Sequence, residues 1–306
     1  MTGPSPANDP LWPRAGNWIV SAEAGDGSCD LALIGVPAHE TSITPTRADT
    51  TPAAVRDALL RYSTWSASSG VDVAGLRAVD FGDVEVPDGP AGEARVRAAV
   101  QAAAEGARLV VALGGDNSIT FPVMSGLFGE IMARGDCGLV TIDAHHDLRD
   151  GVSNGSPVRR LIEEGGLPGR CVVQVGIGDF SNSPEYAERA RELGITTISR
   201  AALRRRGMET GMGLALDIAG ADGRPVFVDI DVDVCDRAAV PGCPSAAPGG
   251  LSADELRHAA FLLGVDPRVR GFDITEIDAS IDAPDGRTVR LAALLVLEAA
   301  AGLASR

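Results

Sequence analysis

The stretch LVTIDAHHDLRD, residues 139–150, joins an uninterrupted apolar run to a cluster of charged side chains. This pattern indicates a buried strand that ends in a functional site, because continuous apolar runs are typical of strands covered on both faces. Further runs of the same kind are LALIGV (31–36), LVVALGG (109–115), CVVQVGI (171–177), PVFVDI (225–230) and VRGFDIT (269–275). Together with GLVTID (138–143), they predict a fold built on buried parallel strands.

Segments with helical spacing lie between these runs. They cover residues 51–62, 89–106, 184–194, 200–219, 252–264 and 286–304. Ser252 followed by Glu255 has the capping-box pattern, which marks the start of a helix. The alternation of strands and helices predicts a three-layer α/β/α fold around a mostly parallel sheet. No Pro/Gly/Ser-rich linker divides the chain, so residues 1–306 are predicted to form one domain, with 1–30 as an irregular N-terminal extension.

The charge balance narrows the class of partner. Lys+Arg number 27 against 42 Asp+Glu, a formal net charge of −15, and the basic residues form no stripe. This composition argues against nucleic acid or an anionic membrane surface and favours a small-molecule substrate or a protein partner. The chain start lacks a signal-peptide pattern and no apolar run is long enough to span a membrane, so a cytoplasmic location is expected. The five cysteines contain no CxxC pair and indicate neither a disulfide framework nor a zinc knuckle.

Polar side chains follow the ends of four predicted strands. The groups are Asp116, Asn117 and Ser118; Asp143, His145, His146 and Asp147; Asp229, Asp231, Asp233 and Asp236; and Thr275, Glu276 and Asp278. In such folds ligands bind at the carboxyl ends of the strands. Alternate residues at a strand end point the same way, so Asp143, His145 and Asp147 can converge. The same reasoning applies to Asp231 and Asp233.

The clustered carboxylates predict a metal site. Several carboxylates in a small space repel one another strongly unless cations neutralise them, so a pair of divalent ions is the simplest explanation. Ligands that are mostly carboxylates, with one or two nitrogens, suit Mn²⁺ or a similar ion better than a structural zinc.

Several of these residues also have a purely structural interpretation. A lone aspartate at a strand end can cap a helix or a turn, and GGDNS can be a tight turn before a helix. His146 faces away from His145 if the strand continues, which predicts packing or hydrogen bonding behind the site. His39 can line the pocket or be exposed in its loop, and His258 is predicted on a solvated helix face.

The blocks GGDNS, DAHHD, DIDVD with the downstream VPGCPSAAPGGLS, and TEID resemble the signature blocks of the ureohydrolase superfamily. This superfamily includes arginases, agmatinases, guanidinobutyrases and formiminoglutamases. The blocks occur in the right order over most of the chain. The resemblance implies an arginase-like parallel sheet of about eight strands, a binuclear manganese site, and a homotrimer or homohexamer.

Carried over position by position, the resemblance also implies roles for individual residues. Asp143 and Asp231 would bridge two Mn²⁺ ions, His145 and Asp233 would complete one, and Asp147 with Asn117 the other. Glu276 would hold the positively charged amidine or guanidine of the substrate. Asp147 and Glu276 are therefore the expected catalytic residues.

Two positions depart from the superfamily pattern. Most members have histidine where this chain has Asn117, and agmatinases have HGT where this chain has Asn154-Gly155-Ser156. An amide oxygen is a weaker ligand than imidazole for a borderline ion, so one ion is expected to be held loosely. Asn154 cannot shuttle protons as histidine can. Formiminoglutamases tolerate both changes, and SNGSPVRRLIEEG and GIGDFSNSPEYAE are most similar to that branch, which acts in histidine degradation.

This similarity predicts hydrolysis of the C–N bond of N-formimidoyl-L-glutamate to L-glutamate and formamide. Water activated by the two ions would attack the formimidoyl carbon, Glu276 would pair with the amidinium, and Asp147 would pass a proton to the departing nitrogen. The two substrate carboxylates require cationic or amide donors. The candidates are Arg159, Arg149, Arg47, Asn154, Ser156 and Asn182, with Arg149 and Arg47 favoured as solvated surface residues.

Two other functions are weighed against this one. A guanidine hydrolase that releases urea, of the agmatinase or guanidinobutyrase type, would be favoured by acidic residues at the substrate tail or a histidine at 154. A pseudoenzyme that kept the fold for binding or assembly is suggested by the missing ligand histidine. A metal titration separates this last alternative, because a binding module is expected to take up fewer than two ions.

Overall fold

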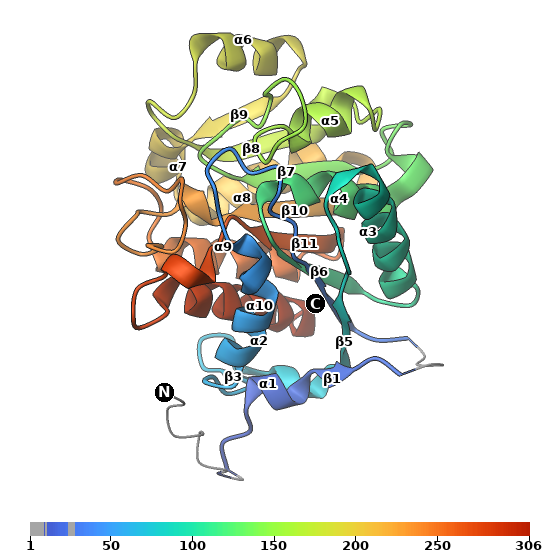
Figure 1. Cartoon of the computed structure of the whole chain (residues 1–306), viewed down its shortest axis with the longest axis vertical. Helices are drawn as coiled ribbons and strands as arrows, with labels where there is room; N and C mark the ends of the chain where they lie inside the picture. Colours follow the sequence, from blue (N-terminus) through green and yellow to red (C-terminus); the bar gives the residue numbers. More distant parts are fainter. Residues whose placement is uncertain (1–8, 10, 24–27) are drawn as a thin grey trace.

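The computed structural model describes residues 9, 11–23 and 28–306, and a nine-stranded sheet forms its centre (Figure 1). All neighbouring strands in this sheet run parallel, in the order β1-β5-β2-β6-β11-β10-β7-β8-β9. The strands are β1 (Val20–Ser21), β2 (Leu31–Val36), β5 (Ala78–Asp83), β6 (Leu109–Gly114), β7 (Gly138–Ile142), β8 (Val172–Ile177), β9 (Thr196–Ser199), β10 (Val226–Asp231) and β11 (Val269–Thr275). A separate antiparallel pair joins β3 (Trp65–Ser66) to β4 (Val71–Asp72). The predicted parallel sheet is confirmed, with nine strands in place of about eight.

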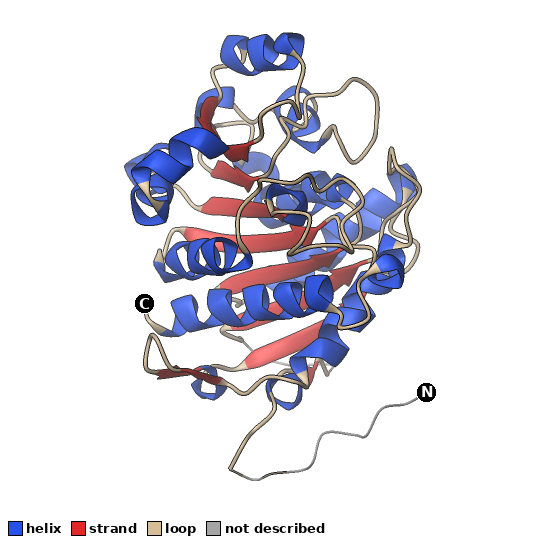
Figure 2. Ribbon diagram, turned by 90° about the vertical axis from the view of Figure 1, so that its left-hand side faces the viewer, coloured by secondary structure: helices blue, strands red, loops and turns tan. Residues whose placement is uncertain are grey.

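Helices cover both faces of the sheet, which confirms the three-layer α/β/α architecture (Figure 2). One hydrophobic core joins the sheet to α2 (Thr51–Leu59), α7 (Arg200–Arg206), α8 (Met208–Ala219), α9 (Ala253–Val265) and α10 (Arg287–Ala304). The other core joins it to α3 (Gly89–Ala104), α4 (Thr120–Phe128), α5 (Pro157–Glu163) and α6 (Pro184–Glu192). The predicted capping box of Ser252 and Glu255 is present at the start of α9. Among the described residues, no helix is both long and apolar enough to cross a membrane.

Strand β2 shows why continuous apolar runs occupy the centre of this fold. Leu31 and Leu33 face one core. Ala32 and Ile34 face the other. Successive side chains of a strand point to opposite faces, so a strand between two helical layers buries every side chain. All six residues of β2 are buried accordingly.

Some elements differ from the sequence prediction. The predicted helix 200–219 is two helices, because Gly207 adopts a φ of +84° that glycine tolerates without steric cost and that ends α7. Strands β5 and β9 lie near the edges of the sheet, and their polar sequences AVDFGD and TTIS give no apolar run. Helices α4 and α5 were not predicted. Helix α4 is buried over most of its length and so shows no polar face, and α5 has only seven residues, which is too few for a clear helical pattern.

The predicted irregular extension, residues 1–30, needs a partial correction. It contains α1 (Ala15–Trp18) and β1, which pairs with β5. Trp18 and Ile19 pack against the core and hold this segment in place. Elements of four and two residues are too short to leave a periodic signal in a sequence. Residues 1–8, 10 and 24–27 of the extension lie outside the described residues.

Candidate metal centre and substrate cavity

Four neighbouring strands bring the predicted polar groups to one edge of the sheet. Strands β6, β11, β10 and β7 are consecutive in the sheet and run parallel, so their carboxyl ends lie together. GGDNS follows β6, TEID overlaps the end of β11, DIDVD ends β10, and DAHHD follows β7. The strand order therefore places residues that are more than a hundred positions apart in the sequence side by side.

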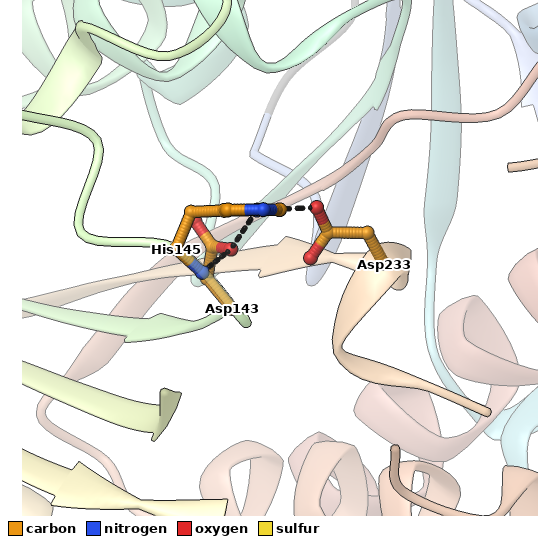
Figure 3. A group of neighbouring side chains, drawn as sticks. All are labelled: Asp143, His145 and Asp233. Carbon is orange, nitrogen blue, oxygen red and sulfur yellow. Dashed lines mark hydrogen bonds and ion pairs between the residues drawn. The ribbon is translucent and has the colours of Figure 1, made fainter. Parts of the chain in front are cut away.

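Asp143, His145 and Asp233 form the tightest group at this edge (Figure 3). One ligand atom from each residue lies within 4.8 Å of those from the other two. His145 Nδ1 is 2.7 Å from Asp233 Oδ2 and 3.5 Å from Asp143 Oδ1. An imidazole and two carboxylates at this spacing can hold a divalent cation.

Short turns orient these aspartates. The Asp143 carboxylate accepts a hydrogen bond from the backbone N–H of His145 at 2.6 Å. The Asp231 carboxylate accepts one from the N–H of Asp233 at 2.8 Å. Aspartate side chains commonly stabilise turns in this way. Asp143 and Asp231 therefore do stabilise turns, which was the structural interpretation of these residues. The second oxygen of each carboxylate remains for another partner.

The electrostatics of the group fit a cation. The carboxyl groups of Asp143, Asp147, Asp231, Asp233 and Glu276 belong to residues that are each at most 7% exposed. Asp143 Oδ2 is buried and accepts no hydrogen bond from any described residue. Burying an unpartnered carboxylate oxygen is costly, and a cation bound there would remove that cost. The residues present therefore fit divalent metal ions.

Burial and mutual repulsion shift the pKa values of the group. Burial raises the pKa of Asp143 well above its ordinary range, and neighbouring carboxylates raise it further. Burial raises the pKa of Asp147 to about 7 and that of Glu276 to about 8. Burial lowers the pKa of His145, but the carboxylates of Asp233, Asp147 and Glu276 together outweigh burial, and the pKa rises to about 9. Without metal, these groups retain protons that a bound cation would displace.

Asn117 occupies the sixth implied ligand position, and both its amide nitrogen and its amide oxygen are hydrogen-bonded. Its Nδ2 donates to Asp147 Oδ2 at 2.6 Å. Its Oδ1 accepts from the hydroxyl groups of Thr275 at 2.8 Å and Thr120 at 3.1 Å. In this arrangement Asn117 orients the Asp147 carboxylate, and its amide oxygen is already engaged.

Glu276 and Asn154, both predicted to bind the substrate, lie in contact with each other. Glu276 Oε1 accepts hydrogen bonds from the backbone N–H of Asn117 and from Asn154 Nδ2, both at 2.8 Å. Asn154 Oδ1 accepts from the N–H of Ile43 at 3.0 Å, which ties a loop of the cavity wall to the site. Glu276 Oε2 accepts no hydrogen bond from a described residue and is left for a cationic group.

The backbone provides a signal that sequence reasoning missed. Asp147 and Glu276 have φ values of +54° and +63°, in the left-handed region that non-glycine residues rarely adopt. Such strain is common where a side chain must point in one direction for function. Neither residue is flanked by a turn motif that would have predicted it.

A cavity of about 430 Å³ adjoins the acidic group. Its described lining includes His145, Asp147, Asp231, Asp233 and Glu276, together with Ile43, Asn154, Tyr186 and Arg149. This volume is in the range of small-molecule sites. Arg149 is the only arginine among the described lining residues.

Two residues predicted to bind the substrate lie elsewhere. Arg159 is outside the cavity lining, where its Nε donates to the carbonyl oxygen of Arg149 at 2.7 Å and its guanidinium pairs with Glu163 at 2.6 Å. Ser156 is completely buried, and its hydroxyl donates to the carbonyl of Ser153 at 2.8 Å. Their assignment to the substrate stays a prediction that this geometry does not support, because helix geometry pairs Arg159 with the residue four positions on and a local turn takes up the serine hydroxyl.

The other histidines have structural environments. His146 is buried behind the site, with Nδ1 2.6 Å from Gln174 Oε1, which agrees with the predicted hydrogen bonding away from His145. His258 is exposed and lies 3.0 Å from Glu209. His39 is half-buried and does not line the cavity.

The three-layer α/β/α fold places the chain in the α/β class, and a cluster of buried carboxylates at the carboxyl ends of its strands is an arrangement that can support metal-assisted hydrolysis. Comparisons with known proteins identify the family within this class. The family model described as "Arginase family" matches residues 29–302, and the chain belongs to this family.

Several similar proteins are named formimidoylglutamase or formiminoglutamase. Formimidoylglutamase from Halalkalibacterium halodurans is 36% identical over 275 residues, which cover 87% of this chain and 85% of the relative. The crystal structure of Bacillus subtilis formimidoylglutamase has a TM-score of 0.90 at 31% identity and covers 99% of this chain and 95% of that one. A crystal structure of Trypanosoma cruzi formiminoglutamase with Mn²⁺₂ has a TM-score of 0.82 at 27% identity, covering 91% and 94%.

Proposed function

We propose that this chain hydrolyses N-formimidoyl-L-glutamate to L-glutamate and formamide. The observation that carries the proposal is one cavity whose lining brings four buried carboxyl groups, those of Asp147, Asp231, Asp233 and Glu276, together with His145. An acidic cavity complements a positively charged amidine. Support comes from the similarity, at 36% identity, to a formimidoylglutamase.

Two Mn²⁺ ions per subunit are the proposed cofactors. Asp143, His145, Asp147, Asp231 and Asp233 would hold them, with Asn117 acting on one ion either directly or by orienting Asp147. When bound, the ions would supply positive charge and make water a nucleophile near neutral pH.

The remaining steps fall to side chains of the cavity. Glu276 would pair with the amidinium through Oε2, while the N–H groups of Asn117 and Asn154 hold Oε1 in place. Asp147 would take a proton from the attacking water and deliver it to the glutamate nitrogen. Water thus adds to the formimidoyl carbon, the bond from that carbon to the glutamate nitrogen breaks, and the nitrogen leaves with the transferred proton.

Three further predictions accompany this function. They are a place in histidine degradation, assembly as a homotrimer or homohexamer, and a cytoplasmic location. Each follows from the resemblance or from composition and is tested separately from the catalytic proposal, for example by light scattering for the oligomer.

The test is product release by the Mn²⁺-reconstituted protein. N-formimidoyl-L-glutamate, agmatine, arginine and 4-guanidinobutyrate are supplied in parallel, and glutamate and urea are measured. Glutamate from the first compound alone is the expected result. Urea from any of the other three would assign the protein to the guanidine hydrolases, and uptake of fewer than two ions without turnover would favour a binding module.

A further inference from the structure

We infer that Arg149 is the specificity-determining residue that binds the anionic tail of the substrate. The inference rests on the proposed function, because it concerns the same cavity. Within the described lining, this side chain is the only permanent cation, and the same lining holds four carboxyl groups. A cavity with an acidic part and one guanidinium complements a dipolar molecule, an amidine that ends in a carboxylate.

The guanidinium of Arg149 is free to bind a ligand. It donates a hydrogen bond to no described residue, and the side chain is exposed to the cavity. Its neighbour Asp150 is the obvious partner, but Arg189 takes up that carboxylate at 2.8 Å. The neighbouring Arg189 and Arg159 are both ion-paired, whereas no ion pair joins Arg149 to a described residue.

The other candidate donors are engaged elsewhere. Arg47 lies outside the cavity lining and pairs with Asp49 at 3.0 Å. Asn182 lines the cavity, but its Oδ1 accepts from the N–H of His146 at 3.0 Å and its Nδ2 donates to the carbonyl of Ala144 at 2.9 Å. Arg149 is therefore the cationic donor that remains in the described lining for a carboxylate.

Two arginines from different helices clamp the backbone that carries Arg149. Arg159 on α5 donates to the carbonyl oxygens of Arg149 at 2.7 Å and Gly151 at 2.5 Å. Arg189 on α6 donates to the carbonyl of Leu148 at 2.7 Å. Residues 148–151 are thus held from both sides, and Arg159 and Arg189 are positioning residues for Arg149.

The absence of a side chain at Gly155 leaves space for the side chain of Arg149. A Cβ atom at residue 155 would lie 2.8 Å from Arg149 Cδ and 3.2 Å from its Nε. It would also lie 3.3 Å from Ile43 Cδ1, so the arginine crosses Gly155 beside Ile43. Any larger residue at 155 has to displace the guanidinium.

Asp147 and Arg149 are close together in the sequence, and this closeness links the acidic part of the cavity to its one arginine. Arg149 follows Asp147 by two residues, so the group that would handle the proton and the group that would hold the tail lie on one short clamped segment. A substrate with an amidine at one end and a carboxylate at the other can contact both.

The experiment compares substrates that differ at the tail. The ratio of kcat/KM for N-formimidoyl-L-glutamate to that for N-butylformamidine, which has no carboxylate, is measured for the native protein and for Arg149→Gln. A lost charge-assisted contact should lower this ratio by about 10- to 100-fold, mainly through KM. Gly155→Ala should lower it in the same direction, and the remote exposed Arg134→Gln serves as the matched control.

Each outcome decides the inference. An unchanged ratio in Arg149→Gln, with native-like thermal unfolding, overturns it. If the native protein releases urea instead, the proposed function fails, and the ratio of 4-guanidinobutyrate to agmatine replaces the first pair with the same expectation. If nothing is turned over, calorimetry with L-glutamate decides: binding that Arg149→Gln loses supports the tail site, and no binding to the native protein overturns it.

Discussion

Asp229 on β10 and Asp273 on β11 are register partners on neighbouring strands, and both are completely buried. They lie two residues before Asp231 and three before Glu276, just beneath the candidate metal centre. Burial raises the pKa of Asp273 to about 7, and burial together with Asp273 raises that of Asp229 well above its ordinary range. Because two adjacent buried carboxylates cannot both ionise without a large cost, the pair is expected to hold a proton near neutral pH.

Replacing one member of this pair should change how stability depends on pH. A carboxyl group with a raised pKa retains a proton that the unfolded chain releases, so the folded protein loses stability as pH rises from about 4 to about 7. Asp273→Asn removes this titration. The free energy of unfolding of the metal-free variant, relative to native protein, should increase over that range by on the order of 2–4 kcal/mol and then level off.

Urea unfolding at pH 4, 5, 6, 7 and 8 measures this difference. The exposed Asp136→Asn is the matched control and should follow the native curve. A constant difference between Asp273→Asn and native protein at all five pH values would show that Asp273 is ionised throughout.

The two adjacent histidines should have separate effects. His145 lies 2.7 Å from Asp233 among the candidate ligands, so His145→Ala should abolish activity and weaken metal binding. His146 contacts Gln174 behind the site, so His146→Ala should retain metal and lose about 1–3 kcal/mol of stability because the buried Gln174 Oε1 loses its partner. Metal content after dialysis and thermal unfolding measure the two effects, and equal metal loss in both variants contradicts the division.

The sequence predicts the parts of this fold that are governed by burial. Strands between two helical layers are apolar throughout, so β2, β6 and β7 are recognisable from composition alone. The polar residues that follow these strands are also recognisable, because charged side chains directly after a buried apolar run have few structural uses. The order of the strands in the sheet, which makes these polar residues neighbours, is what the structure adds.

The residues around the substrate tail were less predictable for a physical reason. Arg149 and Arg159 are ten positions apart in a loop and a short helix, where no periodicity tells which guanidinium reaches the cavity. The answer depends on contacts between segments, chiefly the bond from Arg159 to the Arg149 carbonyl and the space over Gly155. The sequence interpretation named arginine as the residue type for the substrate tail and favoured Arg159, whereas Arg149 is the arginine in the described cavity lining.

A single substitution should tighten the weaker metal position. Asn117 donates to Asp147 at 2.6 Å and offers no free oxygen, whereas an imidazole nitrogen is a stronger ligand for Mn²⁺ than an amide. Asn117→His should therefore lower the Kd of the more weakly bound ion by about 10-fold or more. Equilibrium dialysis with Mn²⁺ measures both sites, and Asn117→Ala, which removes the amide without adding a ligand, is the control. A Kd unchanged in Asn117→His would mean that position 117 does not face the ion.

Metal loading should depend strongly on pH. In the metal-free protein the pKa values of Asp147, Glu276 and His145 are raised to about 7, 8 and 9, so these groups hold protons at neutral pH. A cation has to displace those protons, so Mn²⁺ affinity should rise between pH 6 and pH 9, by up to about tenfold per pH unit for each proton released. Calorimetry in two buffers with different ionisation heats counts the protons directly. Glu276→Gln should lower that count without removing a proposed ligand, and an affinity that is constant from pH 6 to 9, with no buffer-dependent heat, would mean that the site is already ionised before metal binds.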